Sequence, residues 1–541
     1  MPISGSWPYR PSWRESLAAQ GAVAPTASRT TFHSIVQDVL THWRARALDK
    51  RRKPYREVLT LHKDVIREDS REERSRHRTL LNRFTDLAVR YVKKWMPDPY
   101  LFAVILTIIV VILVMAFVSG ASLSGIASGW YQGVWGKDNI FAFAMEMILI
   151  LVGGYTVAEA PLIKRGLKWI ASKPKNQTQG AVLCFAIAAI ACMLNWGLGL
   201  VVGALLARQI FARLKSANFA YLVAAGYMGY MVWTSGLSSS IALANTDPTS
   251  DLNVIWTQTH KLVPLSSTIF RPYSFVPMIV LAVVMGIFVH RMSPQRAEMD
   301  TEAVDEDALL DIDRAPAERP QGTPLTIAER IENLWILNVL VFAAGAFYFV
   351  HSGFKLNISS MVMLFFIIGA LFHWTPIRFI KAFTEAAKTA GPLLLQYPLY
   401  GGIIGLLAYS PNAHVRPLQT VIASAIVSHA TVYTLPFFNY LAAVIISLFV
   451  PSGGGHWGVQ GPVAVSAAVQ LGQTSTAYLG KISMAVANGE AIANMIQPFW
   501  LLPVLAIARL SIRRVMGFTV VAFIVGFIIY GIATLLMPVM P

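Results

Sequence analysis

Charged residues are scarce in this chain of 541 residues. They make up 14% of the sequence, whereas hydrophobic residues make up 55% and the mean hydropathy is +0.53. Soluble domains carry about 25% charged residues. The run "PYLFAVILTIIVVILVMAFVSG", which begins at Pro99, reaches the roughly 20 apolar residues that cross a bilayer as a helix. The composition therefore excludes an ordinary soluble enzyme. It predicts an all-α polytopic protein of the lipid bilayer with about 10–12 membrane segments.

Cysteine and metal-ligand motifs are scarce as well. Cys184 and Cys192 lie eight residues apart in one apolar run, so we interpret them as small core residues rather than as a disulfide or a metal pair. Neither CxxC nor HExxH occurs, and the 11 histidines are scattered along the chain. We therefore expect no metal site, no cofactor and no catalytic residue.

Positive charge is unevenly distributed. Residues 1–95 hold 20 Lys and Arg against 10 Asp and Glu, and the whole chain has a net charge of +16. Because basic residues flank membrane helices on the cytoplasmic side, we interpret 1–90 as a basic, partly disordered cytoplasmic extension rather than a nucleic-acid-binding segment. The acidic stretch 293–330 predicts a cytoplasmic linker between two membrane halves, 91–292 and 331–541.

Twelve apolar stretches follow one another along the chain. The stretch 180–206 has basic loops on both sides, so a single crossing would place positive charge on both faces of the membrane. A re-entrant hairpin with its tip at Asn195, Gly197 and Gly199 avoids this conflict, since irregular backbone is tolerated where protein buries it or water reaches it. We expect the stretches at about 99–119, 139–160, 180–206, 217–244, 270–290, 333–351, 358–374, 391–408, 418–450 (as one piece or two), 456–471, 482–507 and 516–538.

The two halves contain similar segments in the same order. "NWGLGLVVGALLA" at Asn195 pairs with "HWGVQGPVAVSAA" at His456, and the runs that begin at Ala220 and Ala477 follow them. Each half thus predicts a Gly-interrupted hairpin and then a broken helix, which is the arrangement of an inverted-repeat secondary transporter. The basic cluster near Arg509 places the end of the second broken helix in the cytoplasm, which supports inversion.

The two hairpins and two broken helices carry short polar side chains and glycines, but no Lys or Arg in their interior. A helix that begins inside a membrane exposes free N–H groups that favour an anion, and glycines let the backbone approach it closely. Without fixed cations, such a site suits a small monocarboxylate better than a polyanion. The residues expected to bind this substrate are Asn195, Trp196, Gly197, Ser235, Gly236, Ser238, Ser452, Gly453, Gly454, Gly455, His456, Trp457, Gln460 and Asn488.

The same segments contain candidates for a coupling ion. Glu490 is an acid inside an apolar helix, which is expensive and therefore indicates a functional role such as carrying a proton. Asn494 and Ser239 are expected to share this coupling role, and Glu146 and Glu159 in the second apolar stretch are the alternative acids. Free carbonyl groups at the breaks suit Na⁺ equally well, so both H⁺ and Na⁺ remain open.

Other interpretations of these residues also remain open. Serine and glycine in membrane helices often only allow close packing. His456 also fits a satisfied core histidine, Trp457 an interfacial anchor and Glu490 a structural acid. A membrane-embedded hydrolase or transferase is an alternative function, but His456 near a serine is the only candidate for its nucleophile–base pair. A transporter of another small carboxylate is a further alternative.

Four motifs carry a resemblance to a known family. They are "KKWMPDPYLFAVILT" at Lys93, "NWGLGLVVGALLAR" at Asn195, "SGLSSSIALA" at Ser235 and "PSGGGHWGVQGP" at Pro451. Over about 82–541 the chain resembles the short-chain fatty acid transporter family of the ion transporter superfamily, typified by bacterial uptake proteins for acetoacetate and butyrate.

This resemblance implies a multi-pass protein of the bacterial inner membrane, and the distribution of Lys and Arg predicts a cytoplasmic N-terminus. The resemblance also implies uptake of short-chain fatty acids together with H⁺ or Na⁺ and, by analogy with the superfamily, a homodimer. Two positions depart from the family pattern and bear on substrate preference. His456 stands where Gln is more common, and Ser239 stands where Gly is expected.

Overall fold

The computed structural model describes residues 80–95, 97–136, 141–250, 252–294 and 325–540. Within these ranges every regular element is a helix, which confirms the all-α class. Most of the predicted extension 1–90 and linker 293–330 lies outside the described residues. The helices are α2 (Leu80–Trp95), α3 (Pro99–Phe117), α4 (Leu123–Trp135), α5 (Phe141–Glu159), α6 (Pro161–Ala171), α7 (Gln177–Leu194), α8 (Trp196–Arg213), α9 (Phe219–Met228), η1 (Gly229–Ser235), α10 (Ser240–Ala244), α11 (Val254–Thr259), η2 (Leu265–Ser267), α12 (Pro272–Arg291), α14 (Ile327–Glu332), α15 (Trp335–His351), α16 (Ile358–Phe372), α17 (Pro376–Lys388), α18 (Gly391–Ala408), α19 (Leu418–Val427), α20 (Leu435–Ile446), α21 (Gly453–Gln470), α22 (Thr476–Ala493), α23 (Leu501–Ala508), α24 (Ile512–Leu536) and η5 (Met537–Val539).

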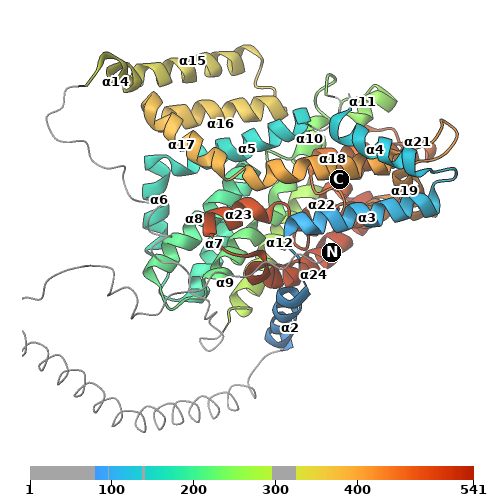
Figure 1. Ribbon diagram of the computed structural model, residues 1–541, viewed down its shortest axis with the longest axis horizontal. Coiled ribbons are helices and arrows are strands. Elements are labelled where there is room, and N and C mark those ends of the chain that lie inside the picture. The colour runs from blue at the N-terminus through green and yellow to red at the C-terminus, as the bar shows by residue number, and fades with distance from the viewer. Residues whose placement is uncertain (1–79, 96, 137–140, 251, 295–324, 541) are drawn as a thin grey trace, which may run out of the picture. The chain divides into compact units, whose positions relative to one another are not determined.

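Long apolar helices dominate this architecture. Among the described residues, six helical stretches are long and apolar enough to cross a membrane: α3, α7, α8, α12, α18 and α24 with η5. The bent pair α5–α6 passes the same test as a unit, and α15, α16 and α20 are shorter apolar helices. In Figure 1, α3 and α4 run beside α18, against which both pack. The structure thus confirms a polytopic membrane protein.

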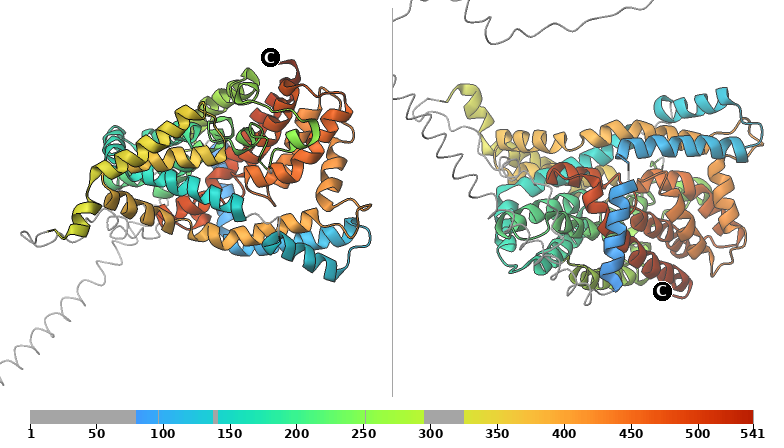
Figure 2. Two further views of the ribbon diagram at one scale, coloured as in Figure 1. Left: turned by 90° about the horizontal axis from the view of Figure 1, so that it is seen from above. Right: turned by 60° about the horizontal axis from the view of Figure 1, so that its bottom comes forward.

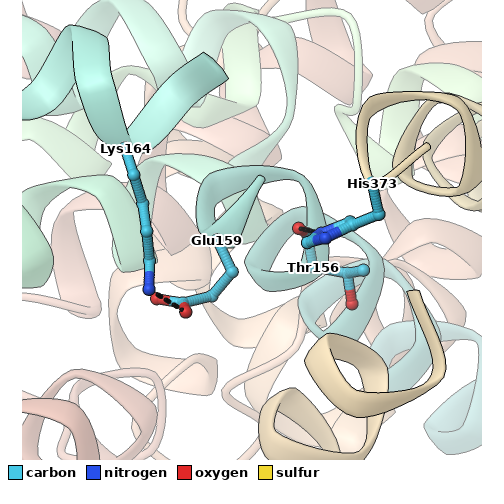
Figure 3. Close-up of polar contacts among 4 residues, drawn as sticks. All are labelled: Thr156, Glu159, Lys164 and His373. Carbon is cyan, nitrogen blue, oxygen red and sulfur yellow. Dashed lines mark hydrogen bonds and ion pairs between the residues drawn. The ribbon is translucent and has the colours of Figure 1, made fainter. Parts of the chain in front are cut away.

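The junction between α5 and α6 is an elbow of 70°. The chain turns at Pro161, which lacks the N–H group that would continue the helix. The carbonyl oxygen of Thr156 accepts a hydrogen bond from Nε2 of His373 at 2.8 Å, and Glu159 pairs with Lys164 at 2.6 Å (Figure 3). A side chain from the end of α16 therefore holds the last turn of α5, while the ion pair spans the elbow.

The predicted first hairpin is confirmed by α7 and α8, which pack against each other and join at Asn195. Asn195 caps α8, because its Oδ1 accepts the amide of Leu198 at 2.9 Å. A Cβ atom at Gly199 would collide with Cys192 on α7, so glycine is required for the two helices to approach. The hairpin is longer than predicted, since it extends over 177–213 rather than 180–206.

The second hairpin consists of α20 and α21, which are joined by residues 447–452. Ser452 caps α21, and its Oγ accepts the amide of Gly455 at 3.3 Å. The glycine-rich stretch that begins at Gly453 is therefore the first turn of a helix rather than a loop. The predicted stretch 418–450 divides into two helices, α19 and α20.

The helix bounds reveal the register of an internal repeat. The cap residues Asn195 and Ser452 are 257 positions apart, and so are Asn218 and Ser475, which cap α9 and α22. The predicted pairing of Asn195 with His456 was therefore wrong by four residues. Four residues are about one helical turn, so the shifted pairing still matched apolar and glycine positions on the same face.

Each hairpin is followed by a broken helix, as predicted. In the first half, α9 continues as η1, breaks at 236–239 and resumes as α10. In the second half, α22 runs unbroken to Ala493 and the chain resumes as α23 at Leu501. Asn488 and Glu490 therefore lie within α22, whereas Asn494 lies in the break itself.

Several helices that were not predicted complete the fold. They include α2, α4, α6 and α17. Figure 2 shows α2 beside α24, and the two helices approach so closely that a Cβ atom at Gly517 would collide with Val89. The compact unit described here begins at Leu80.

Candidate functional site

The first hairpin tip packs directly on the first helix break. The amide of Leu237 donates to the carbonyl of Met193 at 2.7 Å, and the amide of Trp196 donates to Ser238 Oγ at 2.9 Å. A Cβ atom at Gly236 would lie 2.7 Å from the Met193 carbonyl oxygen, so this glycine allows the close approach. Two segments that were predicted to share a site are therefore in contact.

The second hairpin tip meets the same break from the other half of the chain. A Cβ atom at Gly453 would lie 2.6 Å from Ser240 Oγ and 2.7 Å from the ring of Trp233. One helical turn further, Trp457 Nε1 donates to Asn245 Oδ1 at 3.1 Å. Segments more than two hundred residues apart in sequence thus form one site.

The second break completes this arrangement through aromatic side chains. Trp500 Nε1 donates to the carbonyl of Pro451 at 2.6 Å, which ties the second break to the second tip. The ring centroids of Trp500 and Trp196 are 4.5 Å apart, and Tyr230 stacks on Trp233 at 5.6 Å. The two tips and the two breaks therefore surround a common aromatic cluster.

Many buried polar atoms in these four segments lack a hydrogen-bond partner. Burying such an atom unpaired costs about 1–3 kcal/mol, so a cluster of them indicates a place for a polar ligand or an ion. The unpaired atoms are Asn195 Nδ2, Trp233 Nε1, Thr234 Oγ1, Ser239 Oγ, Ser240 Oγ, Asn245 Nδ2, Ser447 Oγ, His456 Nδ1, Asn488 Oδ1 and Nδ2, Glu490 Oε2 and Asn494 Oδ1.

Charge is almost absent from the interior. Among the described Asp, Glu, Lys and Arg side chains, only those of Glu490 and Arg514 are buried. Glu490 Oε1 accepts a hydrogen bond from Asn494 Nδ2 at 3.1 Å, whereas Oε2 is unpaired. No group of three or more His, Cys, Asp or Glu residues that could hold a metal ion occurs in the described part of the chain.

Some predicted site residues have structural partners. His456 Nε2 lies 2.7 Å from Gln460 Oε1, and Gln460 Nε2 donates to the carbonyl of Asn439 at 2.9 Å. Because the Gln460 amide nitrogen is already a donor, its oxygen accepts from His456, which places the histidine proton on Nε2. Gly197 lies against α5, since a Cβ atom there would be 2.8 Å from Leu151 Cα. Ser235 Oγ lies 3.1 Å from Ser274 Oγ on α12.

The aromatic residues of the cluster were missed by the sequence predictions. Tyr230, Trp233 and Trp500 lie beside the breaks, and each is at most 2% exposed. Trp233 precedes the polar run "TSGLSSS" directly, but aromatic residues are common throughout the chain, so their position in the sequence did not distinguish them. Ser240, at the end of that run, was also not among the predicted binding residues.

The family model described as "Short chain fatty acid transporter" matches residues 80–537. Two proteins that carry the name "putative short-chain fatty acid transporter" are similar over nearly their whole length. The one from Escherichia coli K12 is 33% identical, covering 84% of this chain and 99% of its own, and the one from Haemophilus influenzae is 32% identical, covering 82% and 97%.

Two solved transporter structures are more distantly similar. The YdaH transporter of Alcanivorax borkumensis is 14% identical with a TM-score of 0.42, covering 82% of this chain and 98% of its own. MtrF of Neisseria gonorrhoeae is 13% identical with a TM-score of 0.38, covering 83% and 97%. The family match covers the hairpins, the breaks and the site between them, and on that match this chain belongs to the short-chain fatty acid transporter family.

Proposed function

We propose that this protein is a secondary active transporter that takes up short-chain monocarboxylates of the acetoacetate and butyrate type across the bacterial inner membrane. The observation that carries this proposal is the cluster of unpaired polar atoms where two hairpin tips meet two helix breaks. Such a site suits one carboxylate, because hydroxyl groups, amides and helix N-termini can hold a single negative charge. The proposed contacts are Ser452, Gly453, Gly454, Trp457 and Asn488.

We propose that the driving ion is H⁺, with Glu490 as its carrier. Glu490 is fully buried, and within the described part of the chain its carboxylate accepts a hydrogen bond from Asn494 but has no cationic partner. A buried carboxylate without a cation is costly, and binding a proton removes that cost. Na⁺ coupling through the unpaired oxygens of Ser239 and Asn494 is the second candidate.

The enzyme alternative has no support from the comparisons, since the matched family and both relatives are described as transporters. The cytoplasmic N-terminus and the homodimer stay part of the proposal. Accessibility of single cysteines placed in the loop after α6 would test the orientation, and cross-linking in membranes would test the dimer.

Proteoliposomes that contain the full chain test the function directly. Labelled butyrate should accumulate unchanged, and faster than the passive entry of the free acid into protein-free liposomes, when a pH gradient, acidic outside, is imposed, and a Na⁺ gradient alone should have no effect. If only a Na⁺ gradient drives accumulation, the coupling ion is Na⁺ and not H⁺. Failure of every short-chain acid to accumulate, or recovery of a chemically altered product, would contradict the proposed function.

A further inference from the structure

The repeat places two helix N-termini at equivalent positions, but their first residues differ. The first helical residue of α8 is Trp196, whereas the residue 257 positions later, the first of α21, is Gly453. Both helices have 18 residues and a capped N-terminus, so each could in principle hold an anion. The groups around the two tips show which helix N-terminus is free to bind an anion.

The tip of α8 is closed by its own neighbours. The amide of Trp196 is bonded to Ser238 Oγ at 2.9 Å, and the amide of Leu198 is bonded to Asn195 Oδ1 at 2.9 Å. The indole of Trp196 is 1% exposed and packs against Trp500. Two of the three amides in the first turn are therefore already used, and an aromatic ring covers the end of the helix.

The tip of α21 differs in its amides, although an aromatic ring, that of Trp233, lies against this tip as well. Among the described residues no hydrogen bond reaches the amides of Gly453 and Gly454, and the bond from Gly455 to Ser452 is long at 3.3 Å. Ser240 Oγ is unpaired, and its side chain is 2% exposed. It lies 2.6 Å from the position that a Cβ atom on Gly453 would occupy, so a buried free hydroxyl stands at the end of this helix.

We propose that the two tips are unequal and that the substrate carboxylate binds only at the N-terminus of α21. Its oxygens accept hydrogen bonds from the amides of Gly453 and Gly454 and from the hydroxyl of Ser240. The tip of α8 packs against the first helix break and does not bind the carboxylate. This assignment rests on the proposed function. It makes Ser240 a binding residue. It also restricts the substrates to monocarboxylates, because a single anion site would leave the second charge of a dicarboxylate without a partner.

Two serines of the same break provide a matched pair of variants. Ser240→Ala removes a donor at the tip of α21, so KM for butyrate uptake should rise about tenfold, with no decrease in Tm. Ser238→Ala leaves the Trp196 amide unpaired, so Tm should fall, and any rise in KM should be several-fold smaller than that in Ser240→Ala. Both are measured with the full chain in proteoliposomes, by labelled butyrate uptake and by thermal unfolding. Succinate is the competitor and should not inhibit uptake.

The outcomes separate this inference from the proposed function. If wild type transports butyrate but Ser238→Ala raises KM as much as Ser240→Ala, the carboxylate contacts both tips and the inference is wrong. An unchanged KM in Ser240→Ala, or inhibition by succinate equal to that by acetoacetate, would also overturn it. If wild type transports no short-chain acid, the proposed function itself fails.

Discussion

At the scale of single residues, Gly453 has no room for a side chain. A methyl group there would lie 2.6 Å from Ser240 Oγ and 2.7 Å from Trp233, both of which are buried. Gly453→Ala should therefore lower the rate of butyrate uptake at least about tenfold, because Trp233 must move and the helix N-terminus is covered. Gly166→Ala is the matched control, since nothing lies within 4 Å of a Cβ atom at Gly166. Equal uptake by both variants would remove Gly453 from the site.

Glu490 allows a second test at the residue scale. Glu490→Gln keeps the shape of the side chain and a hydrogen-bonding partner for Asn494, but it cannot carry a proton. Net uptake driven by a pH gradient should fall to the passive rate of protein-free liposomes, while protein-dependent exchange of labelled for unlabelled butyrate continues because exchange moves no net proton. Glu146→Gln is the control, since Glu146 is a less buried acid that accepts a hydrogen bond from Ser359 at 2.9 Å. If Glu490→Gln still accumulates butyrate faster than protein-free liposomes under a pH gradient, another group carries the proton.

At the scale of elements, the elbow between α5 and α6 depends on a histidine from another helix. His373 follows the last residue of α16 and donates to Thr156 in α5 (Figure 3). Because this hydrogen bond joins the end of α16 to the last turn of α5, its loss should destabilise the elbow.

Replacement of His373 tests this elbow. His373→Gln keeps a donor for Thr156 and should leave Tm close to that of wild type. His373→Leu removes the donor and should lower Tm, with a loss of about 1–3 kcal/mol of unfolding free energy. A Tm of His373→Leu equal to that of wild type would show that this hydrogen bond does not stabilise the elbow.

The elements themselves were largely predictable, and the register between repeats was not. Hairpins were predicted at 180–206 and around Gly453 because glycines and amides interrupt long apolar runs there. The four-residue error in pairing Asn195 arose because helical periodicity makes sequences shifted by one turn look alike. The caps at Asn195 and Ser452 correct it, since a cap marks where a helix begins.

At the scale of the whole molecule, the compact unit and the family match both begin at residue 80. Deletion of residues 1–79 should therefore leave Tm and butyrate uptake within about twofold of wild type, because the contacts of the site lie within 80–541. Detergent-solubilised and reconstituted protein would give the two measurements. A loss of uptake with unchanged Tm would instead assign the basic segment a role in transport.

The sequence by itself determined the class of protein, the family, the two hairpins and the polar character of the breaks. These features follow from local composition, because apolar length, glycine and small polar residues act within one segment. Only the tertiary structure decided that Ser240 faces Gly453 and that Trp196 closes the other tip against Trp500. Each of these contacts joins segments more than two hundred residues apart, so it depends on how helices pack and not on the residues that flank either partner.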